Sequence, residues 1–91
     1  MRAIRLNADS QVATDKMVIY GLAICGGGDA ATITLYNEAD NSKTATAKVA
    51  KLGVAAGVSD NIMFAPEGLY LDAGVYADVT GTTPEVFVYV R

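Results

Sequence analysis

The 91-residue chain contains no histidine, no tryptophan and only one cysteine. Without histidine, it lacks the commonest general base and the commonest neutral metal ligand. Cys25 has no second cysteine for an internal disulfide and no histidine to activate it, and it lies inside an apolar run, so we expect a buried free thiol. The sequence therefore predicts a protein that is not an enzyme, with no catalytic residues, no cofactor and no metal.

Charged residues are also scarce. They make up 19% of the chain, below the usual quarter, whereas hydrophobic residues make up 52%. The net charge is −3 and the seven Lys and Arg residues are scattered, which argues against a nucleic-acid-binding surface. No signal peptide is visible, and the longest apolar stretch, residues 17–25, is far too short to span a membrane. We expect synthesis in a cytoplasm and no contact with nucleic acid or membrane.

Alternating patterns and turn residues predict an all-β chain. Residues 31–36 alternate cleanly, with Ile33 and Leu35 pointing inward and Thr34 and Tyr36 outward. The Ala and Lys content of residues 43–52 suits a helix, but its position after a hairpin turn favours a strand. The other predicted strands are residues 17–25, 62–66, 68–71, 74–79 and 85–90, with residues 53–61 as a loop.

These elements predict one antiparallel β-sandwich domain, of jelly-roll or Ig-like type, with about seven or eight short strands in residues 16–91. Residues 1–15 are predicted to form an N-terminal arm or edge segment that reaches a neighbouring subunit. A 9.5 kDa domain buries only about 63% of the surface that its unfolded chain exposes. Since the sequence offers no disulfide or metal cluster, oligomerisation is the remaining source of extra stability.

The last predicted strand, residues 85–90, is apolar on both faces. Val86, Val88 and Val90 point one way, whereas Phe87 and Tyr89 point the other. A single packed sheet hides only one of these faces, so the other must meet a second layer or a second subunit. We therefore predict that Phe87 and Tyr89 lie in a subunit interface.

Five tyrosines fall on predicted strands, where tyrosine suits both a half-buried sheet position and a protein interface. We add Tyr70 and Tyr76 to the predicted interface.

The glycine run and the aspartates are interpreted as structural features rather than binding or catalytic sites. The Gly26–Gly28 run lacks the following helix that a phosphate-binding loop requires, so we interpret it as a loop at the end of the sandwich. Asp72 and Asp78 are interpreted as surface carboxylates, and the loop aspartates lack the spacing of a calcium site.

The order of the strands and glycines resembles that of a known group of proteins. The pieces that carry the resemblance are residues 18–22, 33–36, 54–57, 61–64, 68–70, 74–76 and 86–90. Over residues 12–91 this pattern resembles the small β-sandwich structural proteins of tailed bacteriophages, many of them capsid decoration or cement proteins.

The resemblance implies a virion protein made in the bacterial host cytoplasm and located on the capsid surface. It implies a homo-oligomer, often a trimer, that bridges subunits of the phage major capsid protein and stabilises the head. Two alternatives remain open: a tail or fibre-associated structural protein, and a small carbohydrate-binding module, for which tryptophan is missing.

Overall fold

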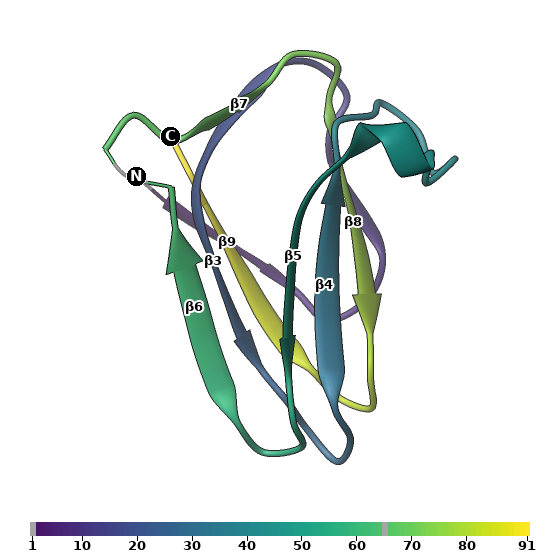
Figure 1. Ribbon diagram of the computed structural model, residues 1–91, viewed down its shortest axis with the longest axis vertical. Helices are drawn as coiled ribbons and strands as arrows, with labels where there is room; N and C mark the ends of the chain where they lie inside the picture. Colours follow the sequence, from purple (N-terminus) through teal and green to yellow (C-terminus); the bar gives the residue numbers. More distant parts are fainter. Residues whose placement is uncertain (1, 65) are drawn as a thin grey trace.

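The computed structural model describes residues 2–64 and 66–91, which fold into two packed antiparallel sheets (Figure 1). The strands are β1 (Arg2–Leu6), β2 (Ser10–Ala13), β3 (Met17–Cys25), β4 (Ala31–Tyr36), β5 (Lys48–Val54), β6 (Ser59–Met63), β7 (Leu69–Leu71), β8 (Val75–Thr80) and β9 (Glu85–Val90). In these described residues, helical structure is confined to the 3-10 turn η1 (Ala45–Ala47), and no helix is long and apolar enough to span a membrane.

The strand order distinguishes between the two predicted sandwich types. Sheet A has the order β1-β9-β3-β6, with β7 also pairing with β3, and sheet B has the order β2-β8-β4-β5. Every pairing is antiparallel. With β7 set aside, the chain visits the sheets in the order A, B, A, B, B, A, B, A, which is that of a jelly roll. The predicted antiparallel sandwich is confirmed, and its topology is of the jelly-roll type.

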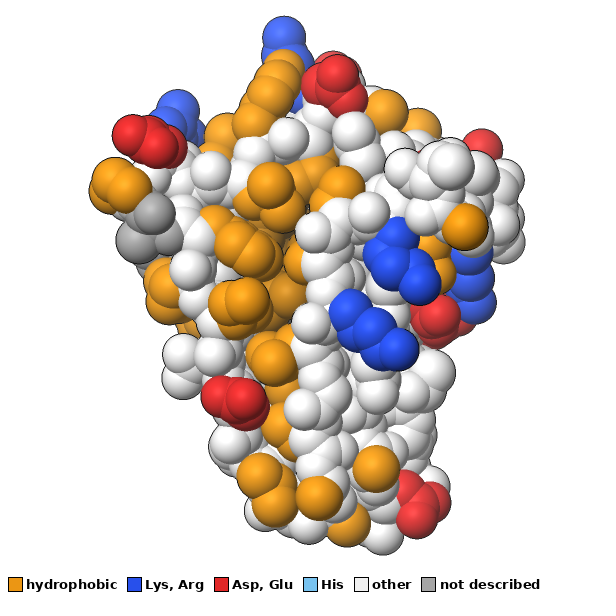
Figure 2. Space-filling view, viewed as in Figure 1, with side chains coloured by type: hydrophobic (Ala, Val, Ile, Leu, Met, Phe, Trp, Pro, Cys, Tyr) orange, Lys and Arg blue, Asp and Glu red, His pale blue; other side chains and the backbone are white. Residues whose placement is uncertain are grey.

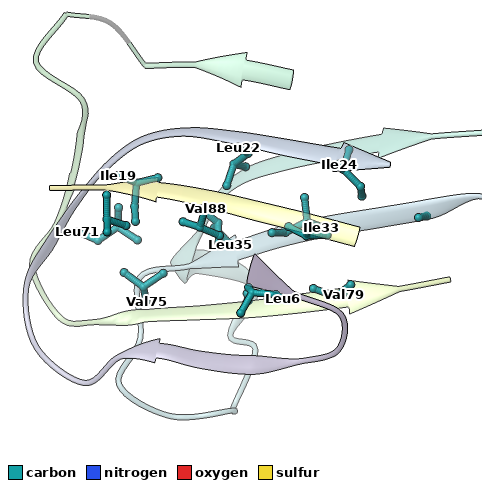
Figure 3. Packing of buried hydrophobic residues seen from close by; sticks show 14 residues of the cluster. Leu6, Ile19, Leu22, Ile24, Ile33, Leu35, Leu71, Val75, Val79 and Val88 are labelled. Carbon is teal, nitrogen blue, oxygen red and sulfur yellow. The ribbon is translucent and has the colours of Figure 1, made fainter. Parts of the chain in front are cut away.

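The core lies between the two sheets and consists of aliphatic side chains. Figure 3 shows Leu22 and Val88 of sheet A meeting Ile33 and Leu35 of sheet B. All four side chains are fully buried, which confirms the predicted inward direction of Ile33 and Leu35.

Strand β9 has the predicted alternation. Val86, Val88 and Val90 are fully buried, whereas Phe87 and Tyr89 are half-buried on the other side of the sheet. Sheet A therefore places the valines against sheet B and the two rings on its outer face.

The N-terminal segment, predicted as an arm or edge segment, forms two edge strands, so that the described residues contain nine strands rather than seven or eight. β1 pairs with β9 at the edge of sheet A, and β2 pairs with β8 at the edge of sheet B. Met1 lies outside the described residues.

Several strand boundaries differ from the predicted ones. β5 begins at Lys48, after η1, rather than at residue 43, and β6 begins inside the predicted loop at Ser59. All five side chains of β6 are exposed, so the sequence carries no alternation to reveal this strand. Ala65, which belongs to the predicted strand 62–66, lies outside the described residues.

Thr34 and Tyr36 point outward as predicted but are only 7% exposed. The reason is the register of the sheet: Thr34 lies between Asp78 and Lys51, whose longer side chains flank it.

Candidate interaction surfaces

The outer face of sheet A carries most of the predicted interface residues. The pairing registers place these residues on it: Ala3, Arg5, Gly21, Ala23, Cys25, Ser59, Asn61, Met63, Tyr70, Glu85, Phe87 and Tyr89. Two of its apolar side chains are well exposed, Tyr70 at 59% and Met63 at 49%. This face is therefore apolar over β3 and the middle of β9, and its charged side chains are Arg5 beside Phe87 and Glu85 at one end.

The two aromatic rings of β9 have mostly small neighbours. Phe87 lies between Arg5 of β1 and Ala23 of β3, and Tyr89 lies between Ala3 of β1 and Gly21 of β3. Arg5 is the one long side chain among these four neighbours, and its guanidinium pairs with Glu85. The rings remain half-buried in the subunit, with their outer surfaces free to contact another molecule.

A hollow of about 390 Å³ lies beside these rings. Its lining includes Phe87 and Tyr89 of β9, Ala23 of β3 and Asn61 of β6. Glu85 also lines it, and Glu85 Oε1 accepts a hydrogen bond from Arg5 Nη2 at 2.6 Å. The hollow combines aromatic rings with amide and carboxylate groups, which suits either a protein side chain or a small polar ligand.

The four predicted interface residues do not form one surface. Tyr70 shares the outer face of sheet A with Phe87 and Tyr89, and it lines a second hollow together with Arg91. Tyr76 lies on the outer face of sheet B and is only 8% exposed. The structure therefore brings three of the four residues onto one face and places Tyr76 on the opposite side of the sandwich.

Tyr76 belongs to a polar cluster at the edge of sheet B. Lys43 Nζ lies 3.1 Å from Asp9 Oδ2 and 3.5 Å from Asp78 Oδ1. The Tyr76 hydroxyl lies 3.4 Å from Asp9 Oδ2, and the Val79 N–H donates to Asp9 Oδ1 at 2.8 Å. Strand β2 pairs with β8 only as far as Ala77, so the Asp9 carboxylate supplies the acceptor that Val79 would otherwise lack.

The cluster shifts the pKa values of its members. Burial acts to raise the pKa of Asp9, but hydrogen bonds from the Val79 N–H and from Lys43 outweigh it and lower the pKa below the usual 3.8. Burial, followed by the negative charge of Asp9, raises the pKa of Tyr76. The hydrogen bond to Asp9 raises the pKa of Lys43. All three shifts favour the charged ion pair and a neutral tyrosine, as expected of a structural cluster.

The remaining candidate residues occupy structural positions. The Gly26–Gly28 run lies where three loops meet, and the Gly26 N–H donates to Val58 O at 2.9 Å. A Cβ atom at Gly27 would overlap the carbonyl oxygen of Thr82. These contacts agree with a tightly packed loop at the end of the sandwich.

Cys25 differs from the prediction. Its side chain lies on the outer face of sheet A, opposite Glu85 and Ser59, and is half-buried rather than buried. The apolar run around it suggested burial, but the register turns odd-numbered residues at this end of β3 outward.

The carboxylates considered for chemistry lie in separate surroundings. Asp72 Oδ1 accepts a hydrogen bond from Asn37 Nδ2 at 2.8 Å, whereas Asp78 faces Lys43. Three of the aspartates accept hydrogen bonds from nearby backbone N–H groups: Asp15 and Asp40 in loops, and Asp60 near the start of β6. In the part of the chain that the structure describes, no three His, Cys, Asp or Glu side chains are grouped so as to hold a metal ion.

A second apolar feature, which the sequence reading missed, is the seam between the edge strands β5 and β6. Figure 2 shows a strip of hydrophobic side chains between these strands. Leu52 on the inner side of β5 is half-buried, and Ile62 on β6 is 38% exposed. Charged side chains on an edge strand oppose pairing with another strand, and each of these two edge strands carries one, Lys51 on β5 and Asp60 on β6. The seam is therefore a less favourable contact surface than the outer face of sheet A.

Comparison of the chain with protein-family models, curated proteins and solved structures gave no match.

Proposed function

We propose that this protein is a non-enzymatic structural subunit that assembles with copies of itself through the outer face of sheet A. The observation that carries this proposal is the grouping of Phe87, Tyr89, Tyr70 and Met63 on one face of a sheet whose other face is already covered. Aromatic residues and methionine are enriched in protein interfaces. A contiguous apolar face of this kind marks an interaction site more often than a free surface.

Within this class, a capsid decoration or cement protein of a tailed bacteriophage is the best-supported role. The sequence resemblance supports it, and jelly rolls are common in viral capsid domains. Since a fold alone does not assign a function, the jelly roll adds only an analogy. In this role the protein forms a homo-oligomer, a trimer by the resemblance, on the capsid surface and bridges subunits of the major capsid protein. A tail or fibre-associated role is the alternative, and electron microscopy of the virion distinguishes the two.

The test compares the wild type with Phe87→Asp and with a control, Thr80→Asp. Thr80 is exposed on the outer face of sheet B, so the Thr80→Asp substitution introduces the same charge on the opposite side of the molecule. We expect light scattering to give an oligomer for the wild type and Thr80→Asp, and a folded monomer for Phe87→Asp. A wild type that stays monomeric at millimolar concentration contradicts the proposal.

One specific observation favours a second candidate, a carbohydrate-binding module. The hollow of about 390 Å³ places Tyr89 and Phe87 beside Asn61 and Glu85. The C–H face of a sugar ring packs on aromatic side chains, while amide and carboxylate groups bind its hydroxyls. Binding of an oligosaccharide on a glycan array, lost in Tyr89→Ala, supports this candidate, and an array without hits excludes it.

A further inference from the structure

The outward-facing side chains of β9 form a pattern that is complementary to itself. In chain order they are Glu85, Phe87 and Tyr89, followed by Arg91 directly after the strand. An acid therefore stands at one end, a base at the other, and two aromatic rings between them. If this row is laid against a second copy in the opposite direction, Glu85 faces Arg91 and Phe87 faces Tyr89.

We infer that two copies of the chain pack with the outer faces of sheet A against each other, related by a two-fold axis that passes close to Val88. This inference rests on the proposed self-association and specifies its geometry. Such an interface uses the same patch on both copies, so every contact occurs twice. It closes at two copies and gives a dimer rather than the trimer that the resemblance implies.

The charges at the two hollows support the antiparallel arrangement. Glu85 lines the hollow beside Phe87 and Tyr89, whereas Lys16 and Arg91 line the second hollow. The two-fold axis brings the acidic hollow of one copy over the basic hollow of the other. Packing the faces in the parallel sense instead would place acid on acid and base on base.

The shape of the face supports close packing of the two sheets. Ala23 in the middle of β3 leaves a low surface beside Phe87, whereas the Met63 side chain lies over Gly21. Side chains of a second copy can enter this space, in the way that packed sheets interdigitate at a separation of about 10 Å. The exposed ring of Tyr70, at the basic end, then lies over the hollow at the acidic end of the second copy.

The available area sets the expected affinity. The strands of sheet A contain 28 residues, which at about 3.3 Å along a strand and about 4.8 Å between strands give roughly 440 Å² per copy, or about 900 Å² for the pair. This area lies below the usual range for a stable specific interface, so we expect a weak dimer that dissociates at high micromolar concentration.

Charge exchange at the two ends of β9 tests the geometry. Glu85→Arg and Arg91→Glu each create like-charge contacts across the two-fold axis, so each should raise the dimer dissociation constant at least tenfold. The double variant restores opposite charges across the axis and should return the dissociation constant to near the wild-type value. Lys48→Glu, at an exposed position of β5, changes the net charge as much as Arg91→Glu does, and it should leave the dimer unchanged.

Sedimentation equilibrium measures the dissociation constants, with an expected dimer mass of 19 kDa from two chains of 9.5 kDa. Circular dichroism checks the fold of each variant. The ion pair of Glu85 with Arg5 is exposed on both sides, so its loss should cost little stability.

The outcomes separate the geometry from the proposed function. If Phe87→Asp disperses the oligomer but the double variant does not recover from its single variants, the two-fold geometry is wrong while self-association stands. A stable trimer of the wild type would likewise show that the two-fold geometry is wrong while self-association stands. If the wild type never associates, both the geometry and the proposed assembly fail.

Discussion

The Asp9 carboxylate accepts a hydrogen bond from the Val79 N–H at 2.8 Å and so continues the edge pairing of β8 beyond the end of β2. We expect Asp9→Ala to lower the free energy of unfolding by about 1 to 2 kcal/mol, because the Val79 N–H loses its acceptor. Asp9→Asn keeps an acceptor oxygen and should lose less. Urea denaturation at pH 7 measures both, and an Asp9→Ala variant as stable as the wild type contradicts this role.

Acid should weaken the same contact. The usual aspartate pKa of 3.8 approximates the pKa of Asp9 in the unfolded chain, and the pKa of Asp9 in the folded protein lies below it. The ionised carboxylate therefore favours the folded state. This stabilisation is fully present above the unfolded pKa and is lost as the pH falls through the lower, folded pKa. The stability difference between the wild type and Asp9→Asn should be constant above about pH 5 and shrink below pH 4. Parallel stability curves down to pH 2 would show that Asp9 does not titrate in this way.

The glycine run at the end of the sandwich offers a matched pair of variants. A methyl group at Gly27 meets the backbone of Thr82, whereas at Gly28 the nearest atom is Thr82 Cγ2 at 3.9 Å. Gly27→Ala should destabilise the fold by about 1 to 3 kcal/mol through forced backbone shifts, and Gly28→Ala should be tolerated. Thermal unfolding compares the two, and equal effects would mean that close packing does not explain the run.

Cys25 reports on the outer face of sheet A without any substitution. Its thiol is half-buried in the single chain and lies beside Glu85, inside the proposed interface. We expect its reaction with a maleimide to slow severalfold as the protein concentration rises through the dimer dissociation constant. In Phe87→Asp the rate should not depend on protein concentration. A concentration-independent rate in the wild type would argue against this interface.

Part of the fold could be predicted from the sequence because some strands bury one face and expose the other. The alternation in β4 and β9 identified which side chains point inward, since burial imposes a period of two on the sequence. Burial imposes no such period on β6, because both faces of this strand are exposed at the edge of sheet A. In β1, the charges of Arg2 and Arg5 obscured a short edge strand.

The interface candidates show the same limit. Phe87 and Tyr89 could be assigned to an outer face from the valines between and beside them, and Tyr70 happens to share that face. Tyr76 lies in sheet B, and nothing local to it indicates to which sheet it belongs. Sheet membership depends on pairings between strands distant in the chain, such as β9 with β3. The opposite charges of Glu85 and Arg91 can be seen in the sequence. They indicate a self-complementary surface only once β9 is placed between β1 and β3 in the interior of sheet A.

Methyl NMR of the wild-type protein over a dilution series tests the central claim most directly. We predict concentration-dependent shifts at Ala3, Ala23 and Met63, which surround the rings of Phe87 and Tyr89 on the outer face of sheet A. The methyl groups of Thr32 and Thr80, on the outer face of sheet B, should not move. Shifts confined to the threonines, or spectra that do not change between micromolar and millimolar protein, would contradict it.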